Sequence, residues 1–225
     1  MEYILNIHTA TEKAMVTICN GNKILSSLIN QEPKQHAAFL HTAIKKILQK
    51  NDIQINSLKA VGVTAGPGSY TGIRVGLATA KGLCFSLKIP LLTFNTLEVM
   101  ALSAIGKIGD PNALYCPMID ARRMEIFTAI YDHELNVIMP ASAMVLEENT
   151  FQELAEKQGI YFFGNGSEKF KKFAEKIPLS AFVTEEISSE ALSHFAWGKY
   201  VRKEFTDLVF AEPLYLKDFH SPIKL

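Results

Sequence analysis

Residues 61–87, VGVTAGPGSYTGIRVGLATAKGLCFSL, run from a short apolar strand through a loop of glycine, proline and hydroxyl residues into a helix. An interior glycine costs a helix about 0.8–1 kcal/mol relative to alanine, so Gly76 and Gly82 together give up roughly 2 kcal/mol. A sequence keeps such residues where another backbone or a ligand must come very close. The helix carries small residues at Gly72, Gly76, Ala78, Ala80 and Gly82.

The composition of the 225 residues indicates an ordinary globular protein in which 48% of residues are hydrophobic and 20% are charged. Lys plus Arg equals Asp plus Glu at 23 each, so no overall basic field is available to hold nucleic acid. Any RNA contact would have to be local or shared with a partner. No stretch reaches the ~18–20 uncharged apolar residues of a membrane span. The three separated cysteines suit a reducing cytoplasm and argue against disulfides or a zinc site.

Periodicity predicts the same order of elements in both halves of the chain: three strands, helix, strand, helix, strand, helix. In the first half these are residues 3–9, 15–19, 24–29, 35–50, 58–64, 72–87, 91–94 and a helix from 96 to about 106 or 109. In the second half the three strands are 114–120, 125–131 and 137–145. Asn149 or Thr150 then caps a helix, with Glu153 three residues after Thr150 as a capping box. The remaining elements are 161–163, 167–175, a weak strand near 182, 189–204, and a last extended piece at 213–216.

Three strands joined by tight turns form an antiparallel meander, and the later alternation of strands and helices implies parallel crossovers. The predicted architecture is therefore α/β, with two lobes that each contain a mixed sheet flanked by helices. We place the N-terminal lobe at residues 1–106 and the C-terminal lobe at residues 107–225. Where the tail after about residue 211 packs is left open, with the N-terminal lobe as one alternative. The repeat is one of element order and not of matching residues.

The loop between this strand and helix lies where backbone N–H groups and a helix dipole can bind an anion. It lacks the Gly-Lys-Ser/Thr of a Walker A loop, the spacing of GxGxxG and the first glycine of a GxSxG nucleophile elbow. The alternative is a tight turn in which Thr71 caps the helix. Pattern alone leaves both open. The residues of the candidate anion or nucleotide loop are Gly66, Gly68, Ser69, Tyr70, Thr71 and Arg74.

The small residues of the helix also have two explanations. Gly72, Gly76 and Ala80 form a smooth strip that Leu83 continues, and this strip could pack on the protein's own sheet or against another helix. Core packing is the safer default. The sharper hypothesis is a four-helix interface between two subunits, in which the preceding helix takes part. The residues of this predicted interface are Phe39, Ala43, Ile47, Gly72, Gly76, Ala80 and Leu83.

Neither the histidines nor the charged turn at residues 120–125 predicts catalysis. His36 and His41 are five residues apart, which places them about 140° apart around a helix, so they form no zinc pair. In the turn, Asp120, Arg122 and Arg123 either pair with other surface ions or offer two arginines to a phosphate or carboxylate in a cleft. No metal site and no catalytic residue are expected.

Three segments together resemble the bacterial TsaB (YeaZ) family. These are GPGSYTGIRVGLATAKGL from Gly66, DARRMEIF from Asp120 and PLYL from Pro213. Members of that family are the dimerisation partners of TsaD in making N6-threonylcarbamoyladenosine at position 37 of tRNA. The resemblance implies two tandem RNase H-like lobes of the actin, Hsp70 and sugar-kinase superfamily, in agreement with the duplicated element order.

The resemblance also implies a non-catalytic subunit of a threonylcarbamoyltransferase complex. It has no required cofactor, although weak ATP or ADP binding is left open. Its expected partners are TsaD, the TsaE ATPase, a second copy of itself when TsaD is absent, and tRNA only through the complex, with no membrane. His8 stands where relatives usually show Asp, and a neutral imidazole is a poor Mg²⁺ ligand.

Two other functions are considered. One is a small nucleotide-binding ATPase or kinase of the same fold superfamily, which would use the glycine loop. The other is a stand-alone RNA-binding module, which the balanced charge disfavours.

Overall fold

The N-terminal lobe is built on a sheet whose strands lie in the order β3-β2-β1-β4-β5. In the computed structural model, which describes residues 1–30, 32, 35–174, 177 and 179–217, strands β1 to β3 form the antiparallel meander and β4 and β5 run parallel to β1. The strands are β1 (Tyr3–His8), β2 (Ala14–Asn20), β3 (Lys23–Asn30), β4 (Leu58–Gly66) and β5 (Leu91–Asn95).

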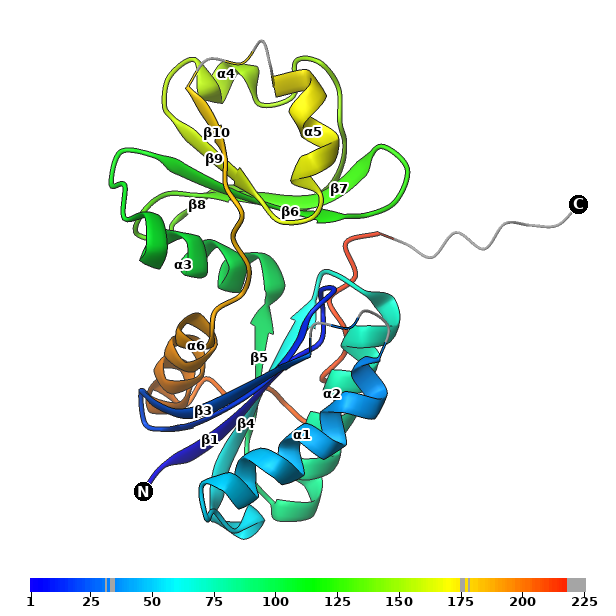
Figure 1. The fold of residues 1–225 in the computed structure, drawn as a ribbon, viewed down its shortest axis with the longest axis vertical. Coiled ribbons are helices and arrows are strands. Elements are labelled where there is room, and N and C mark those ends of the chain that lie inside the picture. Colours follow the sequence, from blue (N-terminus) through cyan, green and yellow to red (C-terminus); the bar gives the residue numbers. More distant parts are fainter. Residues whose placement is uncertain (31, 33–34, 175–176, 178, 218–225) are drawn as a thin grey trace, which may run out of the picture.

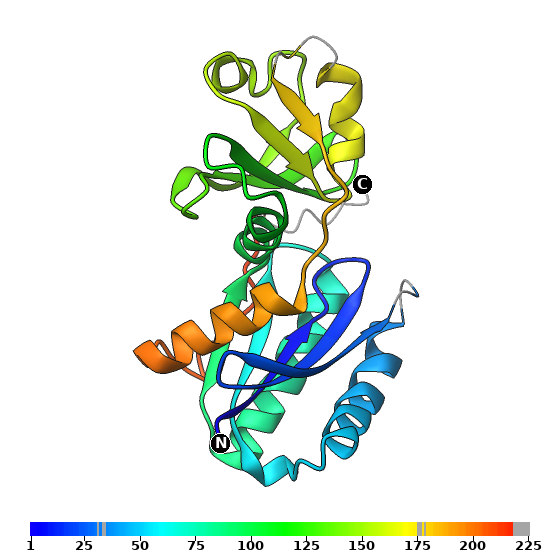
Figure 2. The ribbon, with the colours of Figure 1, turned by 60° about the vertical axis from the view of Figure 1, so that its left-hand side comes forward.

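Helices cover both faces of this sheet (Figures 1 and 2). On one face, α1 (His36–Lys50) and α2 (Tyr70–Leu87) lie side by side and bury their apolar residues against β1, β2 and β4. A short 3-10 turn, η1 (Ile55–Ser57), precedes β4. On the other face lies α6 (Ser189–Arg202), which shares a core with β1 and β5.

The C-terminal lobe repeats this topology. Its strand order, read from the β8 edge, is β8-β7-β6-β9-β10, in which β6 to β10 take the places of β1 to β5. The prediction of two mixed-sheet lobes is confirmed. The strands are β6 (Leu114–Asp120), β7 (Glu125–Tyr131), β8 (Val137–Val145), β9 (Ile160–Phe163) and β10 (Ser180–Phe182). The helices are α3 (Thr96–Ile108), which lies between the sheets, and α4 (Gln152–Ala155) and α5 (Ser167–Ala174) on the far face.

Two local expectations differ from the structure. The boundary at residue 107 separates the two sheets, but α6 packs on the N-terminal sheet, because Ala191, Leu192 and Ala196 are buried against that lobe. The capping box at Thr150 is also wrong. Phe151, with φ 66°, occupies the N-cap of α4 without a side-chain cap, and the Thr150 hydroxyl instead accepts a hydrogen bond from the Glu147 amide at 2.8 Å.

The glycine strip of α2 faces the protein's own sheet. A Cβ placed on Gly76 would lie 2.3 Å from Thr9 Oγ1, and one on Gly72 would lie 2.0 Å from the Thr9 carbonyl oxygen. Thr9 Oγ1 donates a hydrogen bond to the Gly72 carbonyl at 2.7 Å, which fixes this approach. Ala80 is fully buried in the same core. As interface residues, Gly72, Gly76 and Ala80 are therefore wrong, because the strip is buried inside its own lobe, where Thr9 fills the space beside both glycines.

Gly82 differs from the other glycines of α2, since no heavy atom of the protein lies within 4 Å of where its Cβ would be. The fold therefore does not require glycine at this position.

We predict opposite effects on stability from the same substitution at Gly76 and at Gly82. Gly76→Ala should lower the free energy of unfolding by about 1–3 kcal/mol, because the added methyl overlaps Thr9. Gly82→Ala should raise it by about 0.5–1 kcal/mol, because alanine is the better helix former and finds open space. Urea unfolding of the two variants measures both values. A Gly76→Ala protein as stable as the unmodified chain would contradict the packing described here.

Candidate functional site

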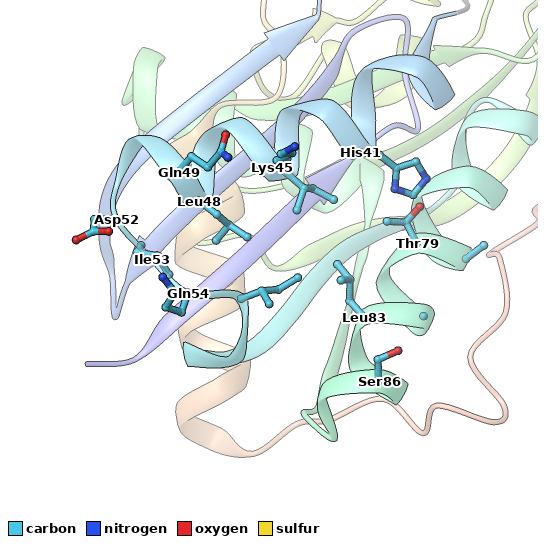
Figure 3. A pocket seen from close by; sticks show the side chains of 14 residues that line it. His41, Lys45, Leu48, Gln49, Asp52, Ile53, Gln54, Thr79, Leu83 and Ser86 are labelled. Atoms are coloured by element: carbon cyan, nitrogen blue, oxygen red, sulfur yellow. The ribbon is translucent and has the colours of Figure 1, made fainter.

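A groove of about 1010 Å³ runs between α1 and α2 on the outside of the N-terminal lobe (Figure 3). We call it the α1/α2 groove. Its walls come from the exposed sides of the two helices and its end is closed by the segment that leads from α1 to η1. The lining residues are His41, Ile44, Lys45, Leu48, Gln49, Asp52, Ile53, Gln54, Ile55, Ala78, Thr79, Gly82, Leu83 and Ser86.

The chemistry of the groove suits packing more than catalysis. Ile44, Leu48 and Leu83 give it apolar walls, and Lys45, Gln49 and Asp52 lie along its α1 side (Figure 3). On the α2 side, the exposed Ala78 and Gly82 are one helical turn apart and leave a shallow, smooth strip. Such a strip admits the side chains of an apposed helix at short distance.

The predicted interface residues are mostly on the other side of these helices. Ala43 and Ile47 are buried in the core of the lobe, so they are wrong as contact residues, and Phe39 is half-buried against that core. Of the predicted set, Leu83 lines the groove. The sequence prediction missed Ala78 and Gly82. Their spacing of four residues was the available signal, but Gly72, Gly76 and Ala80 show the same spacing on the buried face.

The glycine loop is held between two other segments of the chain. On one side, the Ser69 amide donates to the Ala10 carbonyl at 2.7 Å, and a Cβ on Gly68 would lie 2.1 Å from that oxygen. On the other side, the Leu214 amide donates to the Ala65 carbonyl at 2.7 Å. A Cβ on Gly66 would lie 2.5 Å from the Leu214 carbonyl oxygen. These contacts explain the glycines without a ligand.

The N-terminus of α2 is capped by Ser69 rather than by Thr71. Ser69 Oγ accepts a hydrogen bond from the Gly72 amide at 3.2 Å, and Thr71 is exposed. The cap predicted for the tight turn, Thr71, is therefore wrong, because Ser69 takes that position. Binding of an anion, ATP or ADP by this loop stays a prediction.

Tyr70 and Arg74, which follow the loop on α2, meet the C-terminal tail. The Arg74 guanidinium carbon lies 3.8 Å from the centroid of the Tyr70 ring, and Arg74 Nε donates to the Tyr215 hydroxyl at 2.8 Å. The two tyrosine rings stack with their centroids 5.5 Å apart. The segment from Gly66 and the PLYL segment from Pro213, which are far apart in the sequence, thus form one cluster. The C-terminal tail runs beside α2 (Figure 1).

A second cavity, of about 350 Å³, lies between the two lobes. Met15, Met100 and Ile187 contribute apolar walls, and charged residues occupy its rim. Two contacts join the lobes there. Lys13 Nζ lies 2.6 Å from Glu186 Oε2, and Asn165 Nδ2 donates to Glu12 Oε1 at 3.2 Å. Partly exposed ion pairs of this kind contribute little to stability. The remaining lining residues are His8, Thr11, Ile29, Ile119, Gly164 and Glu185.

His8 borders this cavity as a neutral side chain. Its Nδ1 lies 3.0 Å from Thr64 Oγ1 and its Nε2 lies 2.8 Å from Thr11 Oγ1, so two hydroxyl groups satisfy the ring. Burial, with a smaller contribution from the nearby His36 imidazole, lowers the pKa of His8 to about 3. An uncharged imidazole is a poor ligand for Mg²⁺, which prefers oxygen ligands.

Asp120, Arg122 and Arg123 lie in the turn between β6 and β7, and none of them lines the cavity between the lobes. Asp120 Oδ1 accepts from the Arg122 amide at 2.6 Å and contacts Lys169 Nζ at 2.5 Å. Both arginines are exposed and have positive φ values, 70° and 48°. The cleft role of these three residues stays a prediction, since they do not line this cavity.

Within residues 1–30, 32, 35–174, 177 and 179–217, no group of three or more His, Cys, Asp and Glu side chains could hold a metal ion. His36 Nε2 lies 2.8 Å from the Thr11 carbonyl oxygen, whereas His41 faces the α1/α2 groove. The three cysteines are buried free thiols. Over the same described residues, no helix combines the length and apolarity needed to cross a membrane.

The sequence matches known proteins over most of its length. Residues 23–219 match the family described as TsaD, tRNA N6-adenosine threonylcarbamoyltransferase. The tRNA threonylcarbamoyladenosine biosynthesis protein TsaB of Buchnera aphidicola subsp. Schizaphis graminum is 34% identical, over 92% of this chain and 91% of the relative. The protein of the same name from Escherichia coli is 27% identical, over 96% of this chain and 94% of the relative.

Solved structures give the same fold. YeaZ from Pseudomonas aeruginosa superposes with a TM-score of 0.81 at 21% identity, over 96% of this chain and all of that one. An inorganic polyphosphate/ATP-glucomannokinase from Arthrobacter superposes with a TM-score of 0.50 at 12% identity, over 90% of this chain and all of that chain. The fold is therefore that of YeaZ and of the actin-like sugar kinases.

We predict that His8 makes stability fall in acid. Its pKa is about 3 in the folded chain and near 6.5 when unfolded, so the unfolded state alone gains the proton as pH falls below 6.5. The free energy of unfolding should lose about 2 kcal/mol from this group between pH 8 and pH 5, and nothing above pH 7.5. Urea unfolding of the unmodified chain and of His8→Gln across that range isolates the effect. Identical pH profiles for the two proteins would contradict a buried neutral His8.

Proposed function

Because the chain belongs to the TsaB (YeaZ) family of tRNA threonylcarbamoyladenosine biosynthesis proteins, we propose that it is a non-catalytic subunit that binds TsaD through the α1/α2 groove. The role in tRNA threonylcarbamoyladenosine biosynthesis follows from the family. What we propose beyond the family is that TsaD is the partner, that the α1/α2 groove is the contact surface, and that the chain is not itself catalytic.

The observation that carries the proposal is Gly82. A Cβ on Gly72 or Gly76 would overlap Thr9, but a Cβ on Gly82 would meet no heavy atom of the protein within 4 Å outside its own helix turn, and Gly82 lines an open groove between two helices. Interior glycine costs helix stability, and Gly106 of α3 is equally open, so openness alone does not point to a partner. Gly82 differs because it adjoins Ala78 in a partly apolar groove between two helices, which a helix pair from another subunit, packed across α1 and α2, would fill.

TsaD is the partner that the comparisons favour. The family described as TsaD covers residues 23–219 of this chain, so the two proteins share a common fold. Related folds can pair through equivalent helices in a nearly symmetric contact, as two identical chains do. The same groove then accounts for self-association when TsaD is absent. The TsaE ATPase and tRNA are further partners, with tRNA reached through the complex in the cytoplasm.

The absence of catalysis is supported by the cavity between the lobes. An ATPase or kinase of this fold would need a carboxylate to organise Mg²⁺, and the buried position at the end of β1 holds neutral His8 instead. The rim carboxylates Glu12 and Glu186 are engaged by Asn165 and Lys13. The proposed role is therefore to support TsaD by contact.

We predict that Gly82→Arg abolishes binding to TsaD and leaves the monomer folded. The side chain would project into the α1/α2 groove and block an apposed helix, at a cost of at least ~2 kcal/mol or about 30-fold in affinity. The matched control is Gly106→Arg, which introduces the same residue at an exposed helix glycine with open space on α3.

Co-purification with tagged TsaD and circular dichroism of the isolated variants measure these effects. The expected result is that both variants keep their helical signal and that Gly82→Arg alone loses TsaD. If Gly82→Arg retains as much TsaD as Gly106→Arg does, the α1/α2 groove is not the interface.

A further inference from the structure

Tyr70, Arg74 and Tyr215 form an exposed aromatic and cationic cluster that the proposed subunit contact does not use. Tyr70 is 40% exposed and Tyr215 is 45% exposed, although the rings stack on each other and Tyr70 contacts the Arg74 guanidinium. Exposed tyrosines beside an arginine plane are the groups on which unpaired nucleic-acid bases stack. We call this cluster the Tyr–Arg platform.

The platform is continuous with the turn between β6 and β7. Lys217 follows Tyr215 by two residues, about 7 Å of extended chain, and its ammonium group pairs with the Glu125 carboxylate. The Glu125 amide in turn donates to the Arg122 carbonyl at 3.1 Å. The tail therefore joins Arg74 on one lobe to Arg122 and Arg123 on the other along one side of the molecule.

Cations outnumber carboxylates along this path, although the whole chain has no net charge. The carboxylates of Asp120 and Glu125 are engaged by Lys169 and Lys217, while Arg122 and Arg123 are exposed. Lys172 lies beside the same turn, 3.9 Å from Met124 Sδ. Besides the ion-paired Lys169 and Lys217, the cations of this surface are Arg74, Arg122, Arg123 and Lys172.

We propose that this surface binds RNA, with an unpaired base stacked on the Tyr–Arg platform and phosphates held by Arg122, Arg123 and Lys172. The tyrosine pair favours RNA over an acidic peptide, because a peptide carboxylate gains nothing from stacking. Arg74 also continues the exposed ridge of α2 toward Ala78 and Gly82. RNA on this surface would lie beside a TsaD subunit bound in the α1/α2 groove. The placement of RNA next to TsaD therefore rests on the proposed function.

The test is a titration of a fluorescein-labelled RNA hairpin with an unpaired loop, followed by anisotropy at several salt concentrations. It is run with the chain alone and with the chain saturated by TsaD. Arg122→Gln/Arg123→Gln should reduce the slope of log K against log salt by about 1.4, the value for two lost phosphate contacts. Lys23→Gln/Lys59→Gln removes equal charge at the far end of the N-terminal sheet and should leave the slope unchanged.

Stacking is tested at Tyr215. Tyr215→Leu should weaken RNA binding by about 5- to 150-fold at every salt concentration, with the slope unchanged. Tyr215→Phe keeps the ring and should bind within about twofold of the unmodified chain. Unlabelled polyglutamate should compete poorly with the hairpin.

The outcomes separate this inference from the proposed function. Equal slopes for both double variants, unchanged binding by Tyr215→Leu, or polyglutamate competition as strong as that of RNA overturns the RNA surface while TsaD binding stands. Absence of RNA binding by both the chain and its complex overturns it as well. Failure of TsaD to bind refutes the proposed function, and the titration of the chain alone then still decides the RNA contact.

Discussion

The close approach of α2 to the end of β1 is the constraint on which the rest of the N-terminal lobe depends. Thr9 Oγ1 donates to the Gly72 carbonyl, and the absence of Cβ atoms at Gly72 and Gly76 lets the helix backbone lie directly on Thr9. This contact sets the start of α2, and hence the glycine loop that Ala10 and Leu214 hold from both sides. It also leaves the opposite side of α2 exposed beside α1. The groove is thus a consequence of how the buried side is packed.

Much of the fold follows from local patterns in the sequence. Asn20-Gly21-Asn22 places a hairpin between β2 and β3, and the strict order of apolar strands and helices yields two lobes of equal topology. The errors arise where local signals are ambiguous. Thr150 and Glu153 match a capping box, but the Thr150 hydroxyl bonds the Glu147 amide in a tighter turn. The boundary at residue 107 misses α6, because an apolar helix face does not reveal which sheet it covers.

The candidate site was harder to predict for a physical reason. On α2 the buried strip of Gly72, Gly76 and Ala80 and the exposed pair Ala78 and Gly82 are both made of small residues with a spacing of four. Periodicity finds both faces but does not decide which one is inside. That decision comes from Thr9, more than sixty residues away in the sequence. The stacking of Tyr70 with Tyr215 is likewise a long-range contact that no local motif predicts.

The central claim is that the exposed sides of α1 and α2 bind the partner. Hydrogen–deuterium exchange of the unmodified chain with and without TsaD measures this most directly, because it needs no variant and reports on every segment. Slower exchange on addition of TsaD should be concentrated in residues 41–55 and 78–87, with β8 and α5 unchanged. Slower exchange confined to the C-terminal lobe, with both helices unchanged, would contradict the account.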